Sequence, residues 1–378
     1  MTDLRVIISA VGPYHAHEAA RAAHRAGYLE RFIIGVRDPA PTDIPAALCR
    51  KILPPAYLGY ALQQIPHPGS LYFSYGIRDT LFDRWASRCV TPCEVFHGWN
   101  HQCLHSLRKA KELGARVIVT RSSAHPLVQD RILREEYARF GIQHPRSATR
   151  LIARHLQEYE EADFIDVCSE FVKRTMIEQG IPEEKLRLLH VGFNPERFKP
   201  LPKGDDVFRL VFAGAISVRK GVHYLLEAFK RLNLPDAELL LVGGKTPDSR
   251  LFLPAYEGLY RHVPFVPQDR LAGLYSSGSV FVLPSLEEGF GMVVAEAAAM
   301  GLPVIITENV GAPIRDGQDG YIVPIRDVEA LMDRILRLYE DEQLRAEMGR
   351  SARAYIQRFT WERYYEGLIR MYEEAAAL

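Results

Sequence analysis

Residues 283–304 read LPSLEEGFGMVVAEAAAMGLPV, and this stretch decides the fold. The apolar run 280–283 that leads into it has the length expected of a buried strand. A glycine-bracketed loop at 287–291 follows, and residues 292–300 are an alanine-rich run of good helix formers that a glycine and a proline then stop. With the apolar residues 304–306 beyond, the stretch predicts a strand–loop–helix–strand unit of a parallel sheet.

Two carboxylates flank the loop of this unit. Glu288 opens the loop, and Glu296 lies about one turn into the helix. Helical side chains lean toward the N-terminus, so Glu296 can reach back toward a ligand that lies over residues 289–291. Amide groups at a helix N-terminus can bind an anion such as a phosphate. The two carboxylates can bind hydroxyl groups at the two ends of a ligand that carries the phosphate between them. The pattern favours a nucleotide sugar, although a solvated helix start is the simpler alternative because glutamate is favoured there.

The arrangement PS-x-x-EGFG-x-x-x-x-E-A-x-A-x-G-x-PV around Glu288 and Glu296 resembles the signature of the retaining glycosyltransferases of family 4, which have the two-domain GT-B fold. The resemblance implies that Glu288 is a catalytic residue that meets the donor sugar hydroxyls and that Glu296 holds the ribose hydroxyls. It implies that the loop backbone meets sugar and phosphate, through Gly289, Phe290, Gly291, Met292 and Val293.

A basic pair follows the first strand expected in the second half of the chain, which we place at residues 208–214. Arg219 and Lys220 stand just before an expected helix at 222–231. Cations at a helix N-terminus oppose its dipole, so a bound diphosphate explains the pair better than helix stability does; two surface cations are the alternative. Relatives carry Gly-Arg, a spacer and Lys-Gly here, but this chain has Ala215 in place of the arginine. The resemblance implies catalytic roles for Lys220 and, as a substitute, Arg219, with Ser217 as a donor-binding residue.

Three further site residues come from weaker matches. The strand expected at residues 4–11 ends at Gly12, where family members usually have two glycines; Gly12 alone is carried over as a donor contact. His125 follows a short strand at 117–120, in the position where relatives place a catalytic histidine near the reacting sugar carbon; without the resemblance it would be interpreted as a turn residue beside a proline. Val266, in a strand expected at 262–267, falls where relatives cradle the nucleobase.

A possible metal site is the alternative that the sequence raises most directly. Cysteines and histidines recur every four residues from position 89 to position 105, at Cys89, Cys93, His97, His101 and His105. This spacing resembles that of metal ligands. Residues 94–98 have a strand pattern, however, and a four-residue repeat shares one face only on a helix. The chain contains no Asp-x-Asp sequence, the motif with which the other main glycosyltransferase architecture holds a divalent cation. We therefore expect no metal and no other cofactor.

Composition limits the remaining classes. The 378 residues carry a net formal charge of zero. The charge is uneven, because residues 1–200 contain 27 Lys and Arg against 22 Asp and Glu, an excess too small to predict nucleic-acid binding. Five cysteines, a start that lacks the features of a secretory leader, and no apolar run of the ~18–20 residues that span a bilayer favour a cytoplasmic protein. The Pro- and Tyr-rich residues 39–75 either cover the core or touch an apolar acceptor or the inner face of the membrane peripherally.

The chain is long enough for two α/β domains. We predict two Rossmann-like domains facing across a cleft, with residues 1–199 on the acceptor side, a hinge at 200–206 and a nucleotide-sugar-binding domain at 207–358. The resemblance implies that a last helix, within 359–378, returns to the first domain.

These features together predict a retaining, metal-independent glycosyltransferase. It would move a hexose-type sugar from a UDP-, GDP- or ADP-linked donor to a hydroxyl of a glycan, lipid or small metabolite. Fold alone does not fix the chemistry, so a nucleotide-sugar epimerase, a phosphorylase and a non-catalytic sugar-nucleotide-binding protein remain alternatives. No lysine context points to the pyridoxal group of phosphorylases, and the joint presence of Glu288, Glu296 and Lys220 disfavours a non-catalytic module.

Overall fold

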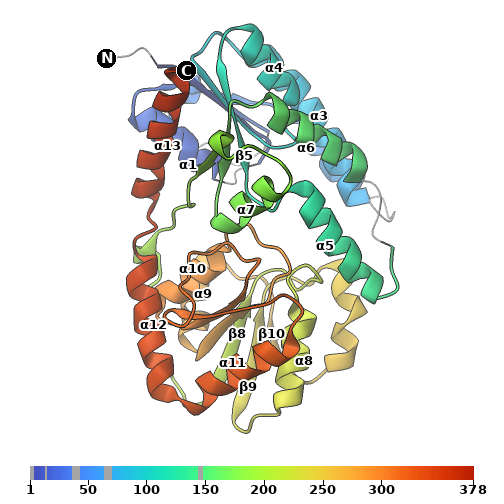
Figure 1. Cartoon of the computed structure of the whole chain (residues 1–378), viewed down its shortest axis with the longest axis vertical. Helices are drawn as coiled ribbons and strands as arrows, with labels where there is room; N and C mark the ends of the chain where they lie inside the picture. The colour runs from blue at the N-terminus through green and yellow to red at the C-terminus, as the bar shows by residue number, and fades with distance from the viewer. Residues whose placement is uncertain (1–3, 13–14, 36–42, 64–69, 144–147) are drawn as a thin grey trace. The chain divides into compact units, whose positions relative to one another are not determined.

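A computed structural model describes residues 4–12, 15–35, 43–63, 70–143 and 148–378 (Figure 1). The chain forms two compact units. The first unit comprises residues Met1–Asp130, His144–Val191 and Trp361–Leu378, and the second comprises Arg131–Gln143 and Gly192–Thr360.

The first unit is built on a seven-stranded sheet of order β3-β2-β1-β4-β5-β6-β7, in which all pairs are parallel. Apolar strands covered on both faces by helices are typical of such a sheet. The strands are β1 (Val6–Ala10), β2 (Leu29–Ile34), β3 (Cys49–Lys51), β4 (Val95–Trp99), β5 (Arg116–Arg121), β6 (Phe164–Val167) and β7 (Leu186–Leu188). The helices are α1 (Ala16–Arg25), α2 (Pro54–Gln63), α3 (Ser70–Ala86), α4 (Leu104–Glu112), α6 (Ala148–Glu161) and α7 (Glu170–Glu178), with α5 (Pro126–Arg139) running from the first unit into the second.

The last helix, α13 (Trp361–Ala376), belongs to the first unit although it ends the chain. It packs beside α1, as Figure 1 shows, and buries Tyr364, Leu368 and Tyr372 in the core of this unit. The predicted return of the C-terminal helix to the first domain is therefore confirmed.

The second unit is a six-stranded parallel sheet of order β10-β9-β8-β11-β12-β13. Its strands are β8 (Phe208–Ala213), β9 (Ala237–Val242), β10 (Arg261–Val263), β11 (Val280–Leu283), β12 (Val304–Thr307) and β13 (Gly320–Val323). Its helices are α8 (Val222–Leu232), α9 (Gln268–Ser276), α10 (Met292–Ala299), α11 (Val328–Glu340) and α12 (Glu342–Ile356).

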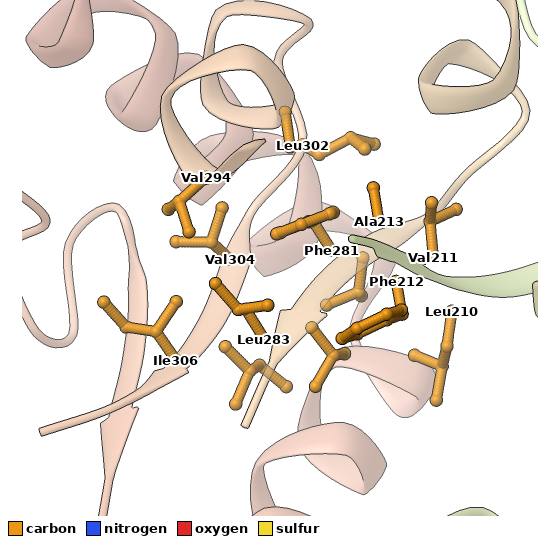
Figure 2. Packing of buried hydrophobic residues seen from close by; sticks show 14 of the residues in the cluster. Leu210, Val211, Phe212, Ala213, Phe281, Leu283, Val294, Leu302, Val304 and Ile306 are labelled. Carbon is orange, nitrogen blue, oxygen red and sulfur yellow. The ribbon is translucent and has the colours of Figure 1, made fainter. Parts of the chain in front are cut away.

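The core of the second unit lies between this sheet and its helices. Figure 2 shows Phe281 and Leu283 of β11 packed beside Val304 of β12, with Val294 of α10 close by. These four side chains are fully buried. The quoted stretch therefore forms the predicted strand–loop–helix–strand unit at the centre of the second sheet.

The structure differs from the sequence-based prediction at several strands, of which two are instructive. The short edge strand β3 was missed, because three residues give too little periodicity. The strand predicted at 262–267 ends at Val263, since Pro264 has no N–H to continue the ladder. Residues 200–206 have irregular backbone and belong to the second compact unit, and their role as a hinge stays a prediction.

The Pro- and Tyr-rich segment 39–75 contains β3, α2 and the start of α3; residues 39–42 and 64–69 of it lie outside the described residues. On α2, Tyr57, Leu58 and Tyr60 are exposed. Within the described part of the chain, no helix is both long and apolar enough to cross a membrane.

Candidate active site

In the second unit the order of strands reverses between β8 and β11. The chain passes from β8 outward to β9 and β10, and from β11 outward in the opposite direction to β12 and β13. Parallel sheets of this kind bind ligands outside the carboxyl ends of the strands at the reversal. The two loops at this position are residues 214–221 after β8 and residues 284–291 after β11.

A glycine brings these two loops into contact. Gly221 has a φ of +64°, and a Cβ placed on it would lie 2.0 Å from the backbone oxygen of Pro284. No other residue type fits this approach without moving the backbone. The Leu286 N–H donates a hydrogen bond of 2.9 Å to the Arg219 carbonyl, which fastens the loops a second time. The loops therefore form one surface.

Four charged side chains meet on this surface. The Glu288 carboxylate accepts a hydrogen bond from the Lys220 ammonium and lies 3.2 Å from Arg219 Nη1. Arg219 also donates to the Glu287 carbonyl at 2.8 Å, and its Nη1 lies 3.5 Å from Glu287 Oε2. The Lys220 side chain is 9% exposed and the Glu287 side chain is fully buried. The structure thus brings together Arg219, Lys220 and Glu288, three of the four residues predicted to be catalytic.

The electrostatics of the cluster argue against a purely structural role. Burial lowers the pKa of the Lys220 ammonium, although Glu288 opposes this shift. Burial also raises the pKa of Glu288, but Lys220 and Arg219 outweigh it, so the pKa is lowered overall. An ion pair at this depth gains about 4 kcal/mol of attraction at an effective dielectric constant of 20. Removing the ions from water costs several kcal/mol each, so the pair adds little net stability.

Two helices begin at the same surface without side-chain caps. The N-cap residues of α8 and α10 are Gly221 and Gly291, both in the left-handed conformation, and neither supplies a side-chain hydrogen bond. Neither helix has an acidic residue in its first turn. A helix start of this kind, next to two cations, is suited to an anion. The predicted donor-binding residues Gly289, Phe290, Gly291, Met292 and Val293 form this loop and the first turn of α10.

Glu296 lies on α10 as predicted and has a partner that the sequence did not reveal. Its Oε2 accepts a hydrogen bond of 2.9 Å from the hydroxyl of Tyr275, a residue in the last turn of α9. Both residues are buried, and burial together with Glu296 raises the pKa of the Tyr275 hydroxyl well above its usual range. Tyr275 therefore fixes the carboxylate in place, and it could not be identified without knowing how α9 packs.

The other two donor-binding candidates of the second unit have different surroundings. The Ser217 hydroxyl accepts a hydrogen bond of 3.3 Å from the Lys220 backbone N–H, so Ser217 shapes the loop that presents the lysine. Val266 lies beyond the end of β10 in irregular backbone and is partly buried against the core of its unit. β10 is an edge strand, two strands away from the reversal of strand order.

The predicted residues Gly12 and His125 belong to the first unit. Gly12 is buried and follows β1, which lies where the strand order of the first sheet reverses. The preceding Val11 N–H donates to Gln102 Oε1 at 2.7 Å, which links the loops after β1 and β4. Pro13, which follows Gly12, lies outside the described residues.

His125 is buried in the loop after β5. Burial, with a smaller effect of Arg121, lowers the pKa of His125 to about 4, so the ring is neutral at pH 7. Its Nδ1 accepts a hydrogen bond of 3.3 Å from the Leu127 N–H. The ring proton is therefore assigned to Nε2, which has no hydrogen-bond partner among the described residues. His125 thus holds an unused donor in the loop beyond the carboxyl end of β5.

A buried polar chain in the first unit was not predicted. The geometry assigns donation from the Tyr372 hydroxyl to His97 Nδ1 (2.8 Å), from His97 Nε2 to Thr120 (2.6 Å) and from Thr120 to Asp166 (2.9 Å). Burial lowers the pKa of His97 to about 3 and raises that of Asp166 to about 7. Tyr372 is 275 residues from His97 in the sequence, so no local pattern could have joined them.

The residues of the possible metal site have separate surroundings. Cys89 ends a short 3-10 helix, Cys93 precedes β4, His97 lies in β4, His101 follows it and His105 lies in α4. Over the described residues, no group of three or more His, Cys, Asp or Glu side chains is arranged to hold a metal ion.

Comparisons with known proteins fit this geometry. Residues 207–341 match the family described as glycosyl transferases group 1. The chain is 27% identical to a D-inositol 3-phosphate glycosyltransferase of Streptomyces bingchenggensis over 91% of this chain and 79% of that protein. It is 31% identical to the enzyme of that name from Saccharomonospora viridis over 62% of this chain, and this match spans 60% of the relative.

Solved structures show the same fold. Sucrose-phosphate synthase from Thermosynechococcus elongatus has a TM-score of 0.72 at 21% identity, covering 98% of both chains. The HepE protein of Anabaena, solved in complex with UDP and glucose, has a TM-score of 0.66 at 15% identity, covering 97% of this chain and 99% of that one.

The chain has the fold of the GT-B glycosyltransferases, and the named relatives support a transferase. Within that class, its second unit matches the glycosyl transferases group 1 over nearly the whole of the second sheet.

Proposed function

We propose that this protein transfers a hexose-type sugar from a nucleotide-sugar donor to a hydroxyl acceptor, with retention at the anomeric carbon and without a metal ion. One observation carries the proposal. Lys220, Arg219 and Glu288 meet where the strand order reverses, beside two helix starts that lack side-chain caps. Such a surface offers positive charge for a diphosphate and a carboxylate for sugar hydroxyls.

The chemistry assigned to these residues follows from charge. When the sugar–phosphate bond breaks, negative charge develops on the leaving diphosphate. Lys220, Arg219 and the amides at the start of α10 would stabilise that charge, and fixed donors of this kind contribute about 2.7–4 kcal/mol each. Glu288 would bind the sugar hydroxyls, and Glu296, held by Tyr275, would bind the ribose. Because two cations already face the diphosphate position, a divalent ion is not needed there.

Retention is proposed from the resemblance of the motif around Glu288 and Glu296 to retaining enzymes. The attacking hydroxyl would approach on the face that the diphosphate leaves, and the leaving phosphate would take its proton. His125 is neutral at pH 7 and has an unused Nε2 donor, so it suits hydrogen bonding to a sugar hydroxyl rather than acid catalysis.

The donor and acceptor are proposed by class. The HepE protein was solved with UDP, which makes UDP-sugars the first donors to test, ahead of GDP- and ADP-sugars. The inositol-phosphate names of the relatives make phosphorylated polyols the first acceptors to test. A cytoplasmic location with peripheral membrane contact through the exposed Tyr57, Leu58 and Tyr60 of α2 is part of the proposal.

Donor binding tests the proposal most directly. The melting temperature of the purified protein would be measured with UDP-, GDP- and ADP-sugars, with and without EDTA. We expect one nucleotide series to raise it equally in both conditions, and Glu288→Gln to remove the added effect of the sugar. Arg231→Met is the matched control, because Arg231 pairs with Glu329 on an exposed surface (2.6 Å). A shift that disappears with EDTA would contradict metal independence, and no shift with any nucleotide sugar would contradict the proposed function.

A further inference from the structure

The second unit contains a cavity that the proposed transfer reaction does not use. Its volume is about 360 Å³, within the range of roughly 300–1,000 Å³ typical of small-ligand sites. None of its lining residues belongs to the loops 214–221 and 284–291 that form the candidate active site. The lining residues that matter here are Phe140, His223, Tyr224, Glu227, Phe252 and Tyr256.

Aromatic rings dominate the wall of this cavity. His223 of α8 stands at the centre, with ring centroids 5.3 Å from Phe140, 4.2 Å from Tyr224 and 5.4 Å from Phe252. Tyr256 adds a further ring from a 3-10 helix. Such a wall binds a ligand with a flat apolar face, since ring contact releases water from both partners.

Two side chains of the wall, His223 and Glu227, can accept hydrogen bonds. His223 Nε2 lies 2.9 Å from Glu136 Oε1, and Glu136 also accepts from Tyr224 (2.7 Å) and Arg326 (2.7 Å). The Glu136 carboxylate accepts a hydrogen bond from His223 Nε2, so Nδ1 carries the lone pair whenever the ring holds a single proton. His223 Nδ1 is buried and has no hydrogen-bond partner among the described residues. It therefore calls for a donor from a ligand.

A second acceptor, Glu227, lies about one turn further along α8 than His223. The Glu227 carboxylate accepts a hydrogen bond of 2.9 Å from the Tyr256 hydroxyl and retains lone pairs for other donors. This carboxylate disfavours an anionic ligand. A cationic ligand is disfavoured at Tyr256, because Lys230 Nζ already lies 5.5 Å from the centre of that ring. The remaining class is a neutral molecule with one apolar face and several hydroxyl donors.

We propose that this cavity binds a pyranose ring of a carbohydrate, independently of the nucleotide-sugar site. The C–H face of the ring packs on the aromatic wall, and its hydroxyls donate to His223 Nδ1 and to Glu227. The inference goes beyond the transfer reaction and requires no turnover for its test.

Saturation-transfer NMR on the full chain tests it. The probes are the methyl α- and β-pyranosides of glucose, galactose and mannose, with maltose and cellobiose, each measured in saturating UDP. We expect at least one probe to bind in the presence of UDP and in Glu288→Gln. We expect Tyr256→Ala to weaken its affinity about tenfold, since that variant loses the ring contact. Phe265→Ala is the matched control, because Phe265 is an aromatic residue of the same unit that is 80% exposed and lies outside the cavity.

The inference is overturned if no probe binds, if UDP or Glu288→Gln abolishes binding, or if Phe265→Ala weakens it as much as Tyr256→Ala does. Should Tyr256→Ala not fold, Glu227→Gln decides, because it keeps the size of the side chain but removes the charge that accepts hydroxyl donors. That variant is expected to weaken binding severalfold, and unchanged affinity would overturn the inference. If the proposed transferase function is wrong, no nucleotide sugar will raise the melting temperature. The binding of the carbohydrate probes to the cavity does not depend on that outcome.

Discussion

The two sheets share one strand order, β3-β2-β1-β4-β5-β6 in the first unit and β10-β9-β8-β11-β12-β13 in the second, but the polar groups at the two reversals differ. In the second unit the loops meet through charged side chains, with Lys220 and Arg219 facing Glu288. In the first unit they meet through a neutral contact, the Val11 N–H with Gln102.

Histidines extend this difference. Burial lowers the pKa of several histidines of the first unit. Among these, the pKa falls to about 4 for His15, about 3 for His97 and about 4 for His125, and well below its usual range for His155. These rings are uncharged at pH 7. One backbone plan therefore supports two kinds of surface, a charged one that suits a diphosphate and a neutral one that suits a hydroxyl compound. Four predictions test this comparison, from the largest expected effect to the smallest.

Replacing the buried cation of the second unit should have the largest effect. Lys220→Met should lower the turnover of the nucleotide sugar by about 10²–10³-fold, since it removes a fixed positive charge from the leaving group. The measurement is nucleotide release under saturating donor, with circular dichroism to confirm folding. Arg231→Met should keep turnover within about twofold. Turnover of Lys220→Met close to that of the wild type would remove the charged surface from the mechanism.

Forcing the two loops of the second unit apart should have the next largest effect, a loss of stability. Gly221→Ala should lower the free energy of unfolding by more than about 2 kcal/mol, because it combines a positive φ with a Cβ that meets the Pro284 oxygen. The control is Gly180→Ala in the first unit, where φ is +85° and a Cβ meets nothing within 4 Å. Urea unfolding measures both variants. Equal losses would mean that the loop contact contributes nothing.

The buried acid of the first unit should respond to pH. The folded-state pKa of Asp166 is raised to about 7 by burial, so its stabilising contribution is present below about pH 4 and is lost as pH rises toward 7. Asp166→Asn cannot ionise. Its stability relative to the wild type should therefore increase between pH 5 and pH 8, by on the order of 2 kcal/mol. Comparing the two proteins cancels the titration of the histidines. A pH-independent difference in urea unfolding would show that Asp166 of the folded protein is already ionised at pH 5, so that burial does not raise its pKa.

The support of Glu296 should give the smallest effect. Tyr275→Phe removes one hydrogen bond to Glu296 and should cost about 1 kcal/mol of stability. The KM for the donor should rise severalfold while kcat changes little, because a ribose contact acts in ground state and transition state alike. If kcat falls with KM unchanged, Glu296 acts on the reacting centre instead.

The sequence predicted the second unit better than the first, for physical reasons. The stretch around Glu288 carries its own strand, glycine loop and helix, so local propensity places Glu288, the loop backbone and Glu296 near one another. Lys220 could be added to the predicted site because a cation beside a helix N-terminus is electrostatically unfavourable unless an anion binds there. Tyr275, the chain from Tyr372 to Asp166, and the Val11–Gln102 contact depend on packing between distant segments. Such contacts leave no periodic pattern in the sequence.

The placement of α13 also sets an order on the folding of the newly made chain. The core of the first unit is closed by Tyr364, Leu368 and Tyr372, which the ribosome adds after the whole of the second unit. The second unit is complete at Thr360, so it has all its residues before the first one does. Domains usually fold from the N-terminus during synthesis, whereas here the unit that begins the chain is the later one to have all its residues. A chain released just before Trp361 would leave the helix-facing side of the first core open to water, which makes premature termination there a cause of aggregation rather than of a shortened active enzyme.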